Sequence, residues 1–120
     1  APNLSPVVSI CQEACGELDI YVQVANNGPH ISVEPSVVVA LYGVSGGQRT
    51  LIDWTELGQY VHPGALSAGY TFRLTSWSQY DSFVAIVDDP AFGPLGANGQ
   101  ANECIEVDNE STFDLSNYCQ

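Results

Sequence analysis

Carboxylates crowd the last third of this chain, where neither lysine nor arginine balances them. Carboxylate, amide and backbone oxygens are the ligands that Ca²⁺ prefers, at about six to eight positions around the ion. The Gly- and Pro-rich stretch 93–99 separates two aspartates from a later acidic run, and its turn-forming residues can bring the two groups together. We therefore predict a calcium site made by Asp88, Asp89, Glu103, Glu106 and Asp108.

The same side chains allow a second interpretation, in which each carboxylate is hydrated and the acidic rim binds nothing. Glu103 and Glu106 are an odd number of positions apart, so on one strand they would face opposite sides of a sheet. The chain also contains no EF-hand run of the form D-x-(D/N)-x-(D/N)-G. Both interpretations stay open at the level of sequence.

The overall charge restricts the class of partner. The chain has 14 Asp and Glu against 2 Lys and Arg, Arg49 and Arg73, for a formal net charge of −12. Phosphate-rich surfaces would be repelled, which argues against nucleic acid and anionic membranes as partners. No apolar run approaches the ~20 residues of a membrane-spanning helix, so direct membrane insertion is not expected.

The four cysteines predict two disulfides and an exported protein. Their spacing does not form the paired C-x2-C arrangement of a zinc knuckle. Cys11 and Cys15 lie where one expected strand turns into the next, and Cys104 and Cys119 flank the last strands. We predict local pairing, Cys11 with Cys15 and Cys104 with Cys119, although four cysteines allow three connectivities.

The elements that must position these residues are strands. Alternating and β-branched apolar runs, separated by Gly, Pro and Asn turns, recur along the chain, and no segment shows a capped helical period. This pattern predicts an all-β protein: one immunoglobulin-like antiparallel β-sandwich domain of about seven strands over residues 1–120. The expected strand segments are 6–10, 18–24, 37–42, 50–54, 70–77, 82–87, 103–107 and 112–115.

Several short motifs, in this order and spacing, resemble the CARDB family, a cell-adhesion-related domain found in bacteria. The opening Pro2-Asn3-Leu4 is similar to the family's Pro-Asp-Leu start. The other matching segments are Val22-Gln23-Val24-Ala25-Asn26-Asn27-Gly28, Leu66-Ser67-Ala68-Gly69-Tyr70-Thr71-Phe72-Arg73-Leu74, Ala85-Ile86-Val87-Asp88 and Glu103-Cys104-Ile105-Glu106-Val107-Asp108-Asn109-Glu110. The long loop 89–102 and the tail 113–119 depart from the family pattern.

This resemblance implies an immunoglobulin-like sandwich in a bacterial extracellular protein, secreted or displayed on the cell surface. It implies a module that spaces other domains or mediates adhesion, with other extracellular domains, a cell-surface protein or a glycan as partners. It does not imply an enzyme, and we expect no catalytic residues.

Two other function classes remain as alternatives. Exposed aromatic side chains could stack on sugars in a carbohydrate-binding module, and the exposure of Trp54 and Trp77 would decide this. A small carboxylate-dependent hydrolase is the second alternative. The two histidines, His30 and His62, adjoin turn prolines, and no G-x-S-x-G motif occurs, so nucleophilic catalysis has little support.

Overall fold

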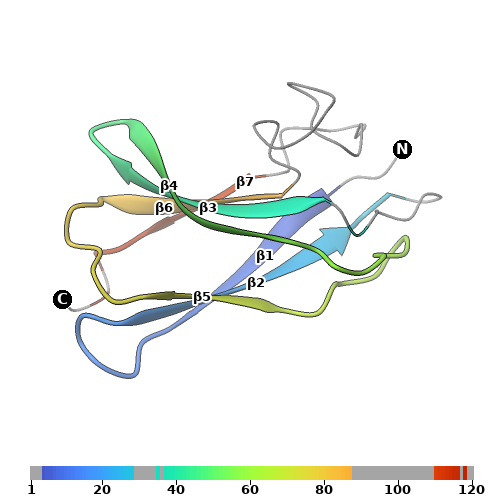
Figure 1. The fold of residues 1–120 in the computed structure, drawn as a ribbon, viewed down its shortest axis with the longest axis horizontal. Helices are drawn as coiled ribbons and strands as arrows, with labels where there is room; N and C mark the ends of the chain where they lie inside the picture. Colours follow the sequence, from blue (N-terminus) through green and yellow to red (C-terminus); the bar gives the residue numbers. More distant parts are fainter. Residues whose placement is uncertain (1–3, 29–34, 36, 88–109, 117, 119–120) are drawn as a thin grey trace.

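The computed structural model describes residues 4–28, 35, 37–87, 110–116 and 118. These residues form seven strands in two antiparallel sheets that pack face to face (Figure 1). No helix occurs among them, and therefore none long and apolar enough to cross a membrane. The predicted all-β sandwich is confirmed.

Three strands form one layer. β1 (Leu4–Cys11), β2 (Leu18–Asn26) and β5 (Tyr70–Leu74) pair in the order β1-β2-β5. β2 lies between the other two, and its apolar side chains recur at every second position because successive residues of a strand face opposite sides. One face of β2 is completely buried, formed by Leu18, Ile20, Val22 and Val24.

Four strands form the other layer, in the order β4-β3-β6-β7. Consecutive strands change sheets after β2, β4 and β5, an arrangement of the immunoglobulin-like type. β1 also contacts β6 and β7 across the interface between the layers. The bounds of these strands are β3 (Val38–Ser45), β4 (Gln48–Glu56), β6 (Ser82–Val87) and β7 (Glu110–Asp114).

Aromatic side chains fill one end of the core. The Phe83 ring lies 5.9 Å from the Tyr80 ring and 5.6 Å from the Phe113 ring, both tilted by 57°. Trp77 is 1% exposed, although β5 ends at Leu74 and does not continue to 77 as expected. Trp77 therefore packs into the core from the connection between β5 and β6, where it follows no strand alternation.

The predicted Cys11–Cys15 bridge is wrong. Cys11 is a free, exposed thiol at the end of β1, and the strand register places Asp19, not Cys15, opposite it. Cys15 lies in the turn between β1 and β2 and does not face Cys11 across the two strands. Cys15 takes part in a disulfide, whereas Cys11 does not. Cys104 and Cys119 lie outside the described residues.

A buried asparagine holds the end of β2. Asn26 is fully buried; its side-chain amide donates to the Val61 carbonyl oxygen at 2.9 Å, and its Oδ1 accepts from the Gly28 N–H at 3.1 Å. Two residues earlier, the Val24 N–H donates to the Ser67 hydroxyl and the Val24 carbonyl accepts from the Ser67 N–H, both at 2.9 Å. The V-x-V-x-N-x-G segment thus holds the β4–β5 connection against the end of β2 by hydrogen bonds.

We expect Asn26→Ala to lower the free energy of unfolding by about 1–3 kcal/mol, because it leaves the buried Val61 carbonyl and Gly28 N–H without a partner. Asn27→Ala is the matched control, since the Asn27 amide donates to the Ser5 hydroxyl at the surface. Urea denaturation of both variants measures the difference. Equal losses in the two variants would contradict the role of Asn26.

Candidate functional site

The five residues of the predicted calcium site, Asp88, Asp89, Glu103, Glu106 and Asp108, lie outside the described residues. The structure does show the frame that precedes and follows them. β6 ends at Val87, β7 begins at Glu110, and Ile86 pairs directly with Glu110 in the antiparallel ladder. The described residues on either side of segment 88–109, Val87 and Glu110, therefore belong to neighbouring, paired strands.

The described carboxylates of the acidic C-terminal third each have another role. Glu110 receives two hydrogen bonds from the Arg49 guanidinium, at 2.8 and 3.0 Å. Asp114 accepts from both the N–H and the hydroxyl of Ser116, at 3.0 and 3.2 Å. Asp81 accepts from the Gly46 N–H at 3.2 Å. No cluster of three His, Cys, Asp or Glu side chains suited to a metal ion occurs in the part of the chain that the structure describes.

The Arg49–Glu110 pair joins the two edge strands of the four-stranded sheet. In a flat sheet the backbones of β4 and β7 would be about 14 Å apart, three strand spacings. The twist of the sheet must bring Arg49 on β4 and Glu110 on β7 closer together for their side chains to meet. The Arg49 hydrogen bonds hold the pKa of Glu110 below its ordinary value of 4.5, and partial burial opposes this shift.

The outer face of this sheet is more apolar than a solvent-facing side normally is. Ala40, Val84 and Ile86 point away from the other sheet, yet they are 0%, 2% and 6% exposed. In cross-strand order, one row runs Trp54, Ala40, Ile86, Glu110. The pairing places the Arg49–Glu110 bridge on the same face as these apolar side chains.

A β-bulge aims two large side chains at this outer face. The register between β3 and β4 shifts between Leu41 and Tyr42, so that Leu51 pairs with Tyr42 and Trp54 pairs with Ala40. Leu51 and Trp54 therefore share a face although they are three positions apart. They are 41% and 47% exposed.

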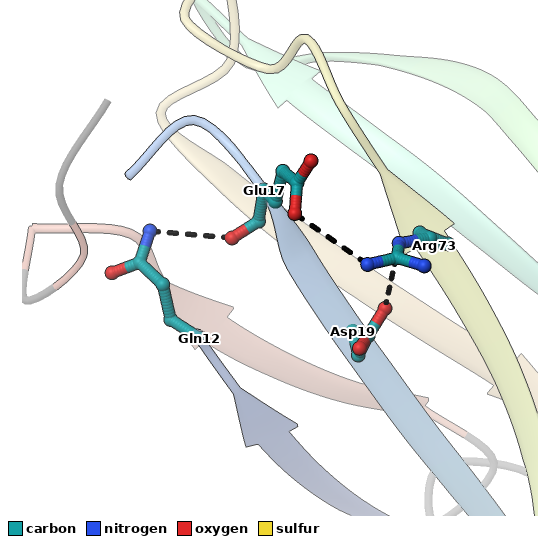
Figure 2. A network of polar contacts seen from close by, with 4 residues as sticks. All are labelled: Gln12, Glu17, Asp19 and Arg73. Atoms are coloured by element: carbon teal, nitrogen blue, oxygen red, sulfur yellow. Dashed lines mark hydrogen bonds and ion pairs between the residues drawn. The ribbon is translucent and has the colours of Figure 1, made fainter. Parts of the chain in front are cut away.

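A second polar network connects β5 with β2 and with the β1–β2 turn in the three-stranded sheet. Figure 2 shows Arg73 of β5 between Glu17 and Asp19, each at 3.5 Å, and the Gln12 side chain donating to the Glu17 carbonyl at 3.3 Å. Asp19 lies directly opposite Arg73 in the register. Both arginines of the chain thus pair with carboxylates.

A shallow hollow of about 250 Å³ lies beside this network. Both polar and apolar groups line it, and its lining residues include neither a carboxylate nor a histidine. Its residues come from the β1–β2 turn and the β5–β6 connection: Gly16, Thr75, Ser76, Trp77 and Ser78. These groups can form hydrogen bonds with a small polar molecule but offer no general base.

No family model matches the chain, and no curated protein matches it. A solved structure does: the CARDB domain of a Pyrococcus furiosus protein, determined in complex with di-metal ions. The two share 23% sequence identity with a TM-score of 0.65, over 94% of this chain and 85% of that one. The chain has the fold of a CARDB domain. The expected resemblance is confirmed at the level of fold.

The sequence interpretation missed the Arg49–Glu110 bridge and the apolar outer face. A signal for the second was present, because segment 37–42 is apolar at every position. A two-layer sandwich buries only one face of each strand, so such a run indicates a covered outer face as well. The bridge had no such signal, since its partners are 61 positions apart.

We expect the Arg49–Glu110 bridge to contribute about 0.2–1 kcal/mol to the free energy of unfolding, as exposed pairs do. Because the folded pKa of Glu110 is lowered, this contribution is present above its unfolded pKa and is lost as pH falls through the folded value. A double-mutant cycle with Arg49→Gln and Glu110→Gln, measured at neutral pH and near pH 3, tests this. A coupling energy that does not change with pH would refute it.

Proposed function

We propose that this chain is an extracellular spacer or adhesion module of a larger bacterial surface or secreted protein. The observation that carries the proposal is the CARDB fold, a two-layer sandwich over nearly the whole chain. Two features support an extracellular setting: the disulfide at Cys15 and the net charge of −12. Its partners would be neighbouring extracellular domains, a cell-surface protein or a glycan, and its role would be non-catalytic.

We also propose that calcium stabilises the acidic end of the domain. The related CARDB structure was determined with di-metal ions. In this chain, the strands that precede and follow segment 88–109 are paired neighbours, and a bound cation would offset repulsion between carboxylates brought together there. The two arginines pair with Glu110, Glu17 and Asp19. Neutralising cations for the other carboxylates must therefore come largely from solution or from a partner.

We expect millimolar Ca²⁺ to raise the melting temperature and EDTA to reverse the rise, since a ligand at 100 times its Kd adds about 2.7 kcal/mol to the stability of the folded state. Asp88→Asn with Asp108→Asn should abolish the calcium response. The matched control is Asp53→Asn on β4, an exposed aspartate outside the acidic segment, which should retain it. Calorimetry with and without Ca²⁺ measures these shifts.

A second readout addresses the spacer role itself. In single-molecule pulling on a tandem polyprotein, a calcium-stiffened spacer should unfold at higher force with Ca²⁺ than with EDTA. An unfolding curve that EDTA leaves unmoved would remove calcium from the proposal, whereas low resistance to force in both conditions would argue against a load-bearing spacer.

Carbohydrate binding is a second candidate because the structure separates the two tryptophans. Trp77 is 1% exposed and belongs to the core, while Trp54 is 47% exposed on the outer face of the four-stranded sheet. Tyr42 lies diagonally across from Trp54 on the same face, within the ~7–8 Å that allows large side chains to act together. Two aromatic rings on one sheet face form a platform on which a sugar ring can stack.

We expect a glycan-array signal, if sugar binding is the function, to disappear in Trp54→Ala because the stacking surface is removed. Tyr60→Ala is the control, since Tyr60 is also exposed, at 61%, but lies in the loop after β4. Absence of any signal for the unaltered protein, or equal loss in both variants, would reject a Trp54 platform.

A further inference from the structure

Among the described strands, β4 has the longest edge that contains no proline, although a bulge at Leu41/Tyr42 interrupts its pairing with β3. Strand order makes β1, β5, β4 and β7 the four edges among the described strands. β5 and β7 span five residues each, and Pro6 interrupts the hydrogen-bonding capacity of β1. β4 spans nine residues, contains no proline, and most of its side chains are exposed. Its backbone is therefore a template for one further strand.

We propose that the edge of β4 docks an extended segment of a partner protein that carries lysine or arginine, by strand addition. In this mode main-chain hydrogen bonds supply affinity, and alternate side chains supply specificity. The proposal goes beyond the spacer role, because it names a surface and the chemistry of its partner. Its test does not use calcium, so its failure and the failure of the calcium proposal are distinguishable.

Charge complementarity selects this occupant. The edge presents Asp53 on one side and Glu56 on the other, opposite Leu41 and Val38 respectively. The one cationic side chain of β4, Arg49, is hydrogen-bonded to Glu110. A second copy of the chain would bring its own net charge of −12 to the same place, and the repulsion would oppose pairing of β4 with β4.

The outer-face side chains of β4 suit an alternating basic and apolar strand. Leu51 and Trp54 are exposed beside the added strand and offer apolar contact area. The stem of a lysine or arginine can lie over the Trp54 ring, where its charge is attracted to the ring face. Glu56 is next but one along the strand and can pair with the same cation or its neighbour. A basic strand thus meets carboxylates and an aromatic ring together.

The experiment uses the intact chain, labelled with ¹⁵N, and three synthetic octapeptides. One alternates lysine and valine, the second has the same sequence with alternate amides N-methylated, and the third alternates glutamate and valine. We expect the lysine peptide to shift amide resonances of residues 48–56 saturably. The N-methylated peptide should lose this effect because its blocked amides cannot pair, and the glutamate peptide should not bind.

Two charge-reversal variants complete the test. Glu56→Lys should weaken the lysine peptide by about tenfold, the equivalent of ~1.4 kcal/mol. Glu13→Lys makes the same charge change in the exposed β1–β2 turn and should alter the affinity less than about twofold. Equal binding of the N-methylated peptide, shifts confined to other strands, or equal effects of the two variants would overturn the proposal. Dimerisation through β4, detected by sedimentation, would also overturn the proposal. The response of the protein to Ca²⁺ tests only the calcium proposal.

Discussion

Burial of the inner faces of the two sheets against each other supports everything else in this domain. β2 contributes an inner face that is apolar from Leu18 to Val24, and β3 and β6 supply the opposing one. At one end the Phe83 ring packs against the rings of Tyr80 and Phe113. Because the side-chain period of a strand is two, this contact also determines which residues point outward. The placement of Trp54 and Glu110 on the outside follows from the same register.

Polar contacts then fix the strand ends and loops, whose positions the packing of the two sheets does not determine. Asn26 and Ser67 tie the end of β2 to the loop between β4 and β5, where an unpaired backbone group would be costly. Two glycines admit rings against the backbone: an added Cβ would lie 2.5 Å from the Tyr80 ring at Gly43 and 1.8 Å from the Tyr21 ring at Gly69. Three of the motif residues shared with the CARDB pattern, Asn26, Ser67 and Gly69, thus have structural roles in this chain.

Electrostatics gives the domain its functional character. Fourteen carboxylates face two guanidinium groups, and each guanidinium connects one strand with residues of another. The remaining negative charge has no intramolecular lysine or arginine to balance it. A protein with this imbalance attracts mobile cations and basic segments of partner proteins. The proposed calcium binding and the proposed strand addition at β4 both rest on it.

The strand pattern by itself determined the fold class. Alternation in 18–24, turn residues between runs and the order of short motifs led to a two-sheet sandwich and to the CARDB resemblance, because these are local properties. It also predicted the strand 82–87, which is β6 and which the acidic segment follows in sequence. The predicted site residues themselves lie outside the described part, so their meeting at one ion stays a prediction.

Only the tertiary structure decided which distant residues meet. The pairing of Cys11 with Cys15 failed because the register sets Cys11 against Asp19, and register depends on the whole ladder. The bulge that brings Leu51 and Trp54 to one face breaks the simple alternation from which a strand's faces are read. The Arg49–Glu110 bridge needs strand order and twist together, and neither is encoded in the spacing of two residues along the chain.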